Sequence, residues 1–275
     1  MERVCIVVLN WNGWRDTLAC VASLQRLEYT NCDVLVVDNG STDGSVEEIR
    51  KTLPELEILE TGCNLGFGGG CNAGIRLAMA RGADYVWLVN NDATVDPAAL
   101  SALVHVADES ASVGAAGSVV MEADDPSRLQ LWGGGRINLW LGRSIHCVEA
   151  GPIDFVSGAS MLLRCRALEQ VGLFDDKSFF MYWEDTDLGF RLRNAGWDLA
   201  VAEGSRIYHQ QSASLGAGSL LLDEYATRSC VRFLRIHAPV PAISVLLTLL
   251  RMLVKRVLVG RFDRLRAVWK AYRSA

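Results

Sequence analysis

The sequence RVCIVVLNWNG (residues 3–13) decides the fold of this chain, because an apolar run ends abruptly in polar turn residues. Val4 to Leu9 form that run, Asn10-Trp11-Asn12-Gly13 form the turn, and a helical pattern follows through about Leu27. A strand that is apolar on both faces and leads into a helix is typical of a parallel sheet covered on both sides.

Strands and helices continue to alternate along the chain. Further strands are predicted at residues 34–37, 56–59, 85–89, 113–120, 160–163 and at 199–202 followed by 207–208, with a helix at about 71–81. We therefore predict an α/β fold, a Rossmann-like and mostly parallel sheet flanked by helices. The predicted domain covers residues 1–212, and a helical basic region covers residues 213–275.

Composition narrows the class of protein. The chain has 275 residues, 50% of them hydrophobic, which is enough to bury a substantial core. Its eight cysteines include no Cys-x-x-Cys pair, which argues against a zinc site and suits a reducing compartment. The first apolar run lacks a basic leader and a small-residue cleavage site, so the expected location is the cytoplasm.

Charge is distributed unevenly. The net charge is −5, yet the segment from Arg228 to the end holds eleven Lys or Arg and one acid, about +10 against −15 before it. An acidic body excludes nucleic acid as its main partner, and a basic tail favours an anionic surface. Residues 251–259 and 261–270 interleave basic and apolar side chains as interfacial helices do. The thirteen uncharged residues 238–250 are too few to span a bilayer.

Three polar clusters end predicted strands: Asn10, Asp38-Asn39 and Asn90-Asn91-Asp92. Open α/β sheets bind ligands beyond the carboxyl ends of their strands, so the clusters are predicted to converge on one site. Each cluster alone is also compatible with ordinary turn chemistry, since Asp-Asn-Gly and Asn-Gly are strong turn formers.

A glycine-rich stretch, Gly66 to Gly70, follows the third predicted strand and lacks the Gly-x-Gly-x-x-Gly spacing of a dinucleotide site. A glycine-rich loop that opens a helix offers backbone N–H groups to a phosphate or a ribose. The alternative is a loop that needs positive φ.

Asp92 is the predicted metal ligand. One carboxylate can hold Mg²⁺ or Mn²⁺ when substrate phosphates and water fill the other positions. His209, which follows another strand pattern, is the best second ligand, and imidazole suits Mn²⁺ better than Mg²⁺. A lone histidine is also commonly a core or surface residue, and we assign no role to His105, His146 or His237.

FFMYWEDTDLGFR (residues 179–191) places three carboxylates within an aromatic stretch at the start of a predicted helix. The helical spacing begins at Leu188, and Gly196 supplies a stop. Asp185 near the helix start is commonly only a cap, worth about 1 kcal/mol. Clustered acids beside aromatic rings that stack on sugars favour a catalytic role, and we interpret Asp185 as a general base.

The motifs together resemble those of family 2 glycosyltransferases, and among these the bacterial rhamnosyltransferase-like enzymes of surface polysaccharide assembly. The resemblance covers about residues 3–237. It rests on VVLNWN (7–12), VDNGSTDG (37–44), NLGFGGGCN (64–72), NND (90–92), WEDTDL (183–188) and YH (208–209).

This resemblance implies a GT-A fold and an inverting transfer from a nucleotide-activated sugar. The site residues that it implies are Asn10, Asp38, Asn39, Asn72 and Asn91 for the nucleotide, Trp183 and Glu184 for the acceptor, Asp92 and His209 for the metal, and Asp185 as base. Asn90 stands where the family often has an aspartate, and residues 154–159 resemble the loop beside the donor sugar.

The implied donor is a dTDP-, UDP- or GDP-linked sugar, with L-rhamnose suggested by the resemblance. The implied acceptor is a saccharide hydroxyl, and a polyprenyl-diphosphate-linked one would suit the basic tail. The implied cofactor is Mn²⁺ or Mg²⁺, and the expected location is the inner face of the cytoplasmic membrane. For the tail, the alternative is a helical hairpin packed on the body or in a homodimer.

Two rival functions remain. A sugar-nucleotide nucleotidyltransferase is expected to carry a glycine-rich loop with a basic residue after its first strand, where this chain has Asn10-Trp11-Asn12-Gly13. A non-catalytic nucleotide-sugar or glycan-binding module is the other, and the joint presence of Asp92, Asp185 and His209 disfavours it.

Overall fold

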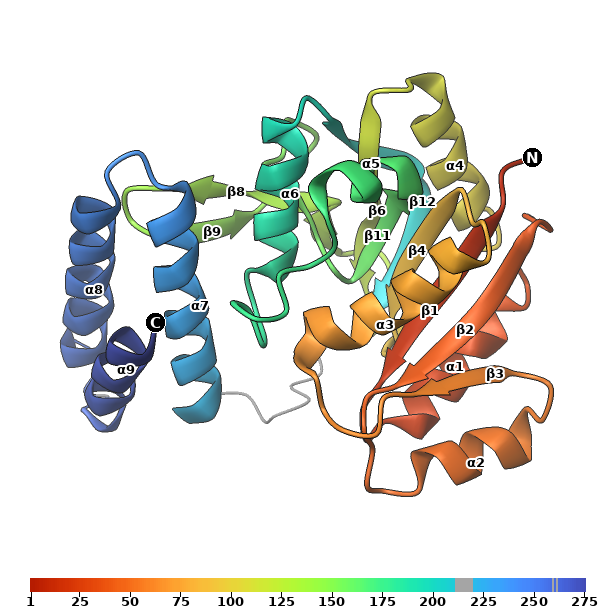
Figure 1. Ribbon diagram of the computed structural model, residues 1–275, viewed down its shortest axis with the longest axis horizontal. Coiled ribbons are helices and arrows are strands. Elements are labelled where there is room, and N and C mark those ends of the chain that lie inside the picture. The colour runs from red at the N-terminus through yellow and green to blue at the C-terminus, as the bar shows by residue number, and fades with distance from the viewer. Residues whose placement is uncertain (211–219, 259, 261) are drawn as a thin grey trace.

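The computed structural model describes residues 1–210, 220–258, 260 and 262–275, and Figure 1 shows a mixed α/β body with a group of helices beside it. The elements are β1 (Val4–Asn10), α1 (Trp14–Leu24), β2 (Cys32–Asp38), α2 (Ser45–Thr52), β3 (Glu57–Glu60), α3 (Gly66–Ala80), β4 (Tyr85–Asn90), β5 (Ala93–Val95), α4 (Ala99–Glu109), β6 (Val113–Glu122), β7 (Leu129–Trp132), β8 (Gly134–Asn138), β9 (Arg143–His146), β10 (Phe155–Val156), β11 (Ser160–Arg164), α5 (Cys165–Val171), α6 (Glu184–Asn194), β12 (Asp198–His209), α7 (Leu220–His237), α8 (Pro241–Leu258) and α9 (Asp263–Ser274).

The main sheet has the order β3-β2-β1-β4-β11-β6-β12-β5, with β7 paired to β6. β1 pairs in parallel with both β2 and β4, and β12 pairs in parallel with β6. β11 runs antiparallel between β4 and β6, and β5 runs antiparallel to β12. A smaller sheet has the order β10-β8-β9. The predicted α/β class with a mostly parallel sheet is confirmed.

Two hydrophobic cores lie on the two faces of the sheet, because successive side chains of a strand point to opposite sides. Val4, Ile6 and Val8 of β1 pack in the core that α1 and α4 cover. Cys5 and Val7 pack in the core that α3, α5 and α6 cover. The apolar run of the first strand therefore serves both cores.

Helix α3 begins earlier than predicted, at Gly66 instead of about Cys71, so the glycine-rich stretch is helical and is not a loop. Only Gly66 of this stretch has a positive φ, +77°. A Cβ on Gly70 would lie 2.5 Å from Leu9 Cδ1, and one on Gly74 would lie 2.6 Å from Val7 Cγ1. These two glycines let the helix approach the sheet closely.

The C-terminal helices α7, α8 and α9 pack on one another beside the body, and Figure 1 shows α7 next to α6, with α8 beyond it. Phe179 of the body shares a core with Cys230, Val231, Phe233 and Leu234 of α7. The expected boundary between residues 212 and 213 lies outside the described residues. Within the described chain, no helix combines the length and the apolar character needed to span a bilayer.

Part of the basic charge in this region faces inward. Asp223 pairs with Arg256 at 3.4 Å and with Arg264 at 2.9 Å. Glu224 pairs with Arg228 at 2.8 Å and with Lys270 at 3.0 Å. Arg256, Arg264 and Lys270 therefore join α8 and α9 to α7, whereas Arg228 pairs within α7.

Candidate functional site

Two of the predicted polar clusters meet where β1 and β2 end, because Asn10 and Asp38 are partners in the parallel register. Asn10 Nδ2 donates to Asp38 Oδ1 at 2.7 Å and to Ser41 Oγ at 3.1 Å. Thr17 Oγ1 donates to Asn10 Oδ1 at 2.8 Å and accepts from Asn91 Nδ2 at 3.1 Å. One hydrogen-bond network thus joins the ends of three strands, as the sequence predicts.

Asn39 and Asn72 are buried and fix α3 in place. Asn39 Nδ2 donates to Gly66 O at 3.0 Å, and Asn39 Oδ1 accepts from Leu65 N at 3.0 Å. Asn72 Nδ2 donates to Phe174 O at 2.9 Å. Both amides therefore hold the start of α3 against the neighbouring loops.

Two cavities open along this edge and share Phe67 and Asn90 in their walls. The first, about 130 Å³, is lined by Leu9, Trp11, Asn39, Asn64, Gly66, Phe67, Asn90, Asn91, Asp92 and Met181. The second, about 290 Å³, is lined by Phe67, Asn90, Gln130, Leu131, His146, Ser157, Gly158, Ala159, Glu184, Asp185 and His209. We call them the nucleotide-side cavity and the carboxylate-side cavity.

The structure brings most predicted site residues to these cavities. Asn39, Asn91 and Asp92 line the nucleotide-side cavity, and the second cavity receives Glu184, Asp185 and His209. The walls of the two cavities do not include Asn10, Asp38, Asn72 or Trp183. Asn10, Asp38 and Asn72 instead hold neighbouring segments in place through the hydrogen bonds given above. Trp183 packs against Phe233 of α7.

Asp92 and His209 converge as predicted, with His209 Nε2 3.1 Å from Asp92 Oδ1. His209 Nδ1 lies 2.9 Å from Gln130 Oε1, and Asn90 Nδ2 lies 3.2 Å from His209 Nε2. The two amide contacts suit a proton on Nδ1, whereas the carboxylate of Asp92 suits a proton on Nε2. The described residues contain no cluster of three or more His, Cys, Asp or Glu that could hold a metal alone.

Asp185 lies in the first turn of α6 and does not act as the cap of that helix. Its Oδ2 accepts from Gly158 N at 3.2 Å, and its Oδ1 accepts from Thr186 N at 2.6 Å. Burial raises the pKa of Asp185 above its usual range, against these hydrogen bonds and the charge of His146.

Glu184 is only 6% exposed, and its Oε2 has no hydrogen-bond partner among the described residues. Burial, together with the neighbouring charge of Asp185, raises the pKa of Glu184 to about 8. Burial thus raises the pKa of both adjacent carboxyl groups, and the hydrogen bonds from Gly158 N and Thr186 N oppose this rise at Asp185.

Sequence reasoning missed several residues of the site. Gln130 and His146 line the carboxylate-side cavity, yet they lie outside the recognised motifs, whereas Gly158 belongs to the 154–159 segment that the resemblance indicated. His237, to which no role was assigned, donates from Nε2 to Asp187 Oδ1 at 2.8 Å. Such contacts join segments that are far apart in the sequence, so no local sequence pattern predicts them.

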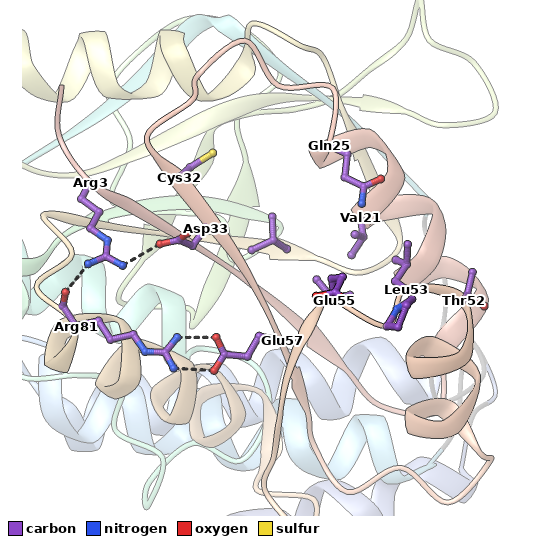
Figure 2. Close-up of a pocket in the computed structure, with 13 residues that line it drawn as sticks. Arg3, Val21, Gln25, Cys32, Asp33, Thr52, Leu53, Glu55, Glu57 and Arg81 are labelled. Atoms are coloured by element: carbon purple, nitrogen blue, oxygen red, sulfur yellow. Dashed lines mark hydrogen bonds and ion pairs between the residues drawn. The ribbon is translucent and has the colours of Figure 1, made fainter.

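A larger hollow of about 720 Å³ lies at the opposite edge of the sheet, where β2 and β3 begin (Figure 2). Its charged side chains pair with one another: Arg3 with Asp33 at 3.0 Å, and Arg81 with Glu57 at 2.6 Å. The hollow thus offers no cluster of acids beside an imidazole, and we place the functional site at the carboxyl edge.

Residues 2–220 match the family described as Glycosyltransferase like family 2. The chain is 32% identical over 223 residues to an N-acetylglucosaminyl-diphospho-decaprenol L-rhamnosyltransferase of Mycobacterium tuberculosis, covering 71% of this chain and 72% of that protein. The chain therefore belongs to glycosyltransferase family 2, which confirms the resemblance, and it is a glycosyltransferase of the nucleotide-sugar-dependent class.

Solved structures show the same fold at low identity. The mannosyltransferase PcManGT from Pyrobaculum calidifontis, in complex with GDP-Man and Mn²⁺, superposes with a TM-score of 0.63 at 18% identity, covering 100% of this chain and 75% of that one. GalNAc-T7 with UDP, GalNAc and Mn²⁺ gives 0.68 at 12% identity, covering 83% and 47%. These matches confirm the predicted GT-A fold.

Proposed function

We propose that this protein transfers a sugar, with inversion, from a nucleoside diphosphate to a saccharide hydroxyl, and that Asp185 is the general base. The observation that carries the proposal is the shared cavity of Asp185, Glu184 and His209, which adjoins the cavity of Asp92. A base and a diphosphate-binding pair are thus side by side, as a displacement at an anomeric carbon requires.

In the proposed reaction, a carboxylate oxygen of Asp185 removes the proton from the acceptor hydroxyl as its oxygen attacks the anomeric carbon. Attack on the face opposite the departing diphosphate inverts the anomeric centre. Gly158 N and Thr186 N hold the carboxylate in position through the hydrogen bonds to its two oxygens. General-base catalysis of this kind contributes about 100- to 10,000-fold.

The donor set at Asp92 and His209 fits a divalent cation, because a carboxylate oxygen and an imidazole nitrogen, both common metal ligands, lie 3.1 Å apart. When bound, the cation would neutralise charge on the leaving diphosphate. Diphosphate oxygens and water would complete its coordination. We expect Mn²⁺ ahead of Mg²⁺, because imidazole suits Mn²⁺ better.

The rhamnosyltransferase relative suggests the substrates. We take dTDP-rhamnose as the first donor to test, ahead of UDP- and GDP-linked sugars, and a polyprenyl-diphosphate-linked saccharide as the acceptor class. Membership of the family sets aside the nucleotidyltransferase alternative. Formation of a glycosylated product separates the enzyme from a binding module.

We also propose that residues 213–275 form a separate helical unit, outside a catalytic domain of residues 1–212. The unit attaches the protein to the cytoplasmic face of the membrane, where a lipid-linked acceptor would lie. Ile243, Leu246, Leu250, Val254 and Val257 form an exposed apolar stripe along α8, since they recur every three or four residues. A homodimer through the same stripe is the competing arrangement.

The test combines turnover and binding. Purified protein is incubated with dTDP-rhamnose, Mn²⁺ or Mg²⁺ and N-acetylglucosaminyl-diphospho-decaprenol, and the product is detected by mass spectrometry. Asp185→Asn is expected to lower turnover by about 100-fold or more while dTDP still raises the melting temperature. Asp33→Asn, at the opposite edge of the sheet, is the control. Retained turnover with lost dTDP binding in Asp185→Asn would contradict the assignment of the base.

A further inference from the structure

The loop of residues 178–183, which leads into α6, has an unusual backbone. Tyr182 and Trp183 have φ of +67° and +73°, in the left-handed region that side chains other than glycine rarely adopt. Each such residue costs about 1–2 kcal/mol and persists only where its surroundings hold it. Glu184 and Asp185 follow immediately, so whatever holds this loop also orients the two acids.

Helix α7 supplies two hydrogen bonds to this loop. Arg232 Nη1 donates to Ser178 O at 2.6 Å, at the beginning of the loop. Ser229 Oγ donates to Met181 O at 2.9 Å, directly before the two left-handed residues. Two carbonyl groups of the loop are thus fixed by side chains of one turn of α7.

Aromatic rings of α7 hold the loop as well. Tyr225 stacks on Phe180 with ring centroids 5.0 Å apart, and Phe233 packs against Trp183 at 4.9 Å. Such pairs contribute about 0.5–1.5 kcal/mol beyond the area that they bury. Trp183 therefore faces α7, which explains why it is not part of the cavity wall.

The same helix contacts α6 one turn further on. His237 Nε2 lies 2.8 Å from Asp187 Oδ1, and Arg191 Nε donates to Asp187 Oδ2 at 2.7 Å. Asp187 is buried, two residues after Asp185. Burial alone would raise its pKa, but the hydrogen bond from His237 and the charge of Arg191 lower the pKa below the usual range.

The loop in turn contacts the substrate cavities. Phe180 O accepts from Phe67 N at 3.0 Å, and the side chain of Phe67 lines both cavities. A continuous set of contacts therefore runs from α7, through the loop, to the shared wall of the site.

We propose that α7 contributes to the acceptor site. Its residues Arg232, Ser229 and His237 are positioning residues. They hold the 178–183 loop and the first turn of α6, and thereby orient Asp185 toward the acceptor. The inference rests on the proposed function, in which Asp185 is the base. It gives the C-terminal helices a role in the reaction besides attachment.

The experiment compares two arginines of the same helix. Arg232→Ala removes the bond to Ser178 O, whereas Arg235→Ala is the matched control, because Arg235 lies over Tyr272 of α9. Hydrogen–deuterium exchange of peptides covering residues 178–187 reports on the loop without substrate. Kinetics with dTDP-rhamnose and N-acetylglucosaminyl-diphospho-decaprenol report on the reaction, and the thermal shift with dTDP and Mn²⁺ reports on nucleotide binding.

Arg232→Ala is expected to speed exchange in residues 178–187 and to lower kcat/KM for the acceptor by about 100-fold, since a misplacement of about 1 Å far from the reacting atoms costs that much. The thermal shift with dTDP should not change, Arg235→Ala should match wild type, and Arg232→Lys should restore part of the loss. Should Arg232→Ala fail to fold, Ser229→Ala removes only the bond to Met181 O.

Unchanged exchange in these variants, or faster exchange with wild-type kinetics, overturns the inference. A loss of dTDP binding equal to the loss of acceptor turnover also overturns it, because that pattern indicates general unfolding. Absence of sugar transfer by the wild-type protein is a different result, since it contradicts the proposed function while the exchange data still report on the loop.

Discussion

At the scale of single residues, Glu184 and Asp185 are neighbours in the first turn of α6, yet they have different hydrogen-bond partners. Asp185 accepts from two backbone N–H groups, whereas Glu184 Oε2 has none among the described residues. Hydrogen bonds favour the charged form, and burial without them disfavours it. Asp185 is therefore better suited to be the ionised base, and Glu184 to be a neutral acid beside it.

Replacing Glu184 should change how stability depends on pH. Its pKa is raised to about 8 in the folded protein, from an ordinary value near 4.5, so the folded state loses stability as pH rises from about 4.5 to 8. Glu184→Gln removes this titration and should flatten the curve, with a gain on the order of a few kcal/mol at pH 8.

The measurement is urea denaturation from pH 5 to 9. Glu47→Gln, on the exposed face of α2, is the control and should follow the wild-type curve. A Glu184→Gln curve parallel to wild type would show that Glu184 is already ionised in the folded protein at neutral pH.

Gln130 should affect metal affinity without contacting the metal. Its Oε1 lies 2.9 Å from Nδ1 of His209 and so orients the ring with Nε2 facing Asp92. Loss of such a partner typically weakens metal binding by about 10- to 100-fold. Gln130→Leu should therefore bind Mn²⁺ more weakly in the presence of dTDP, measured by electron paramagnetic resonance. Equal Mn²⁺ affinity in Gln130→Leu and wild type would contradict this orientation of His209.

At the scale of elements, α3 depends on its glycines for packing. A Cβ on Gly74 would lie 2.6 Å from Val7 Cγ1 in the interior of the sheet, so Gly74→Ala should destabilise the protein by about 1–3 kcal/mol. Gly151, around which a Cβ meets no atom within 4 Å, provides the control substitution Gly151→Ala. Chemical denaturation measures the free energy of unfolding of both variants. Equal losses in the two variants would show that α3 can move away from the sheet.

The glycine-rich stretch also shows where sequence reasoning fails. The apolar strands and their polar ends were predictable, because strand burial and the convergence of carboxyl ends follow from local patterns. That a helix begins at Gly66 was not, since intrinsic propensity disfavours glycine, and the close packing of Gly70 on Leu9 and of Gly74 on Val7 overrides it. The antiparallel direction of β11 was not predictable either, because an apolar run does not indicate which way its strand runs in the sheet.

The candidate site likewise contains residues that the sequence predicts and contacts that it does not. Asp92, His209 and Asp185 belong to short motifs and could be assigned from spacing and resemblance. Gln130 contacts His209 across 79 residues of sequence, and His237 contacts Asp187 across 50, so only the folded structure reveals these contacts.

At the scale of the whole molecule, helix α8, which carries the apolar stripe, lies on the far side of α7 from the α/β body (Figure 1). Leu250 is 50% exposed and Val254 is 55% exposed, on a helix that also carries the exposed Lys255. An exposed apolar stripe next to basic residues fits an anionic lipid surface. α7 lies between α8 and the loop of residues 178–183. Attachment to the membrane and binding of the acceptor would therefore occur on connected elements.

The substitution pair Leu250→Glu and Val254→Glu tests this attachment. Each fully buried Leu or Val side chain contributes about 1.5–3 kcal/mol, so the double variant should bind vesicles of phosphatidylglycerol and phosphatidylethanolamine at least about 100-fold more weakly in flotation assays. The pair Thr52→Glu and Ala80→Glu adds the same charge at exposed positions of α2 and α3, and should bind like wild type. Binding should also weaken with salt, because the charge contribution is screened. If wild type does not float, and sedimentation shows a dimer that Leu250→Glu and Val254→Glu convert to a monomer, the stripe is a subunit interface instead.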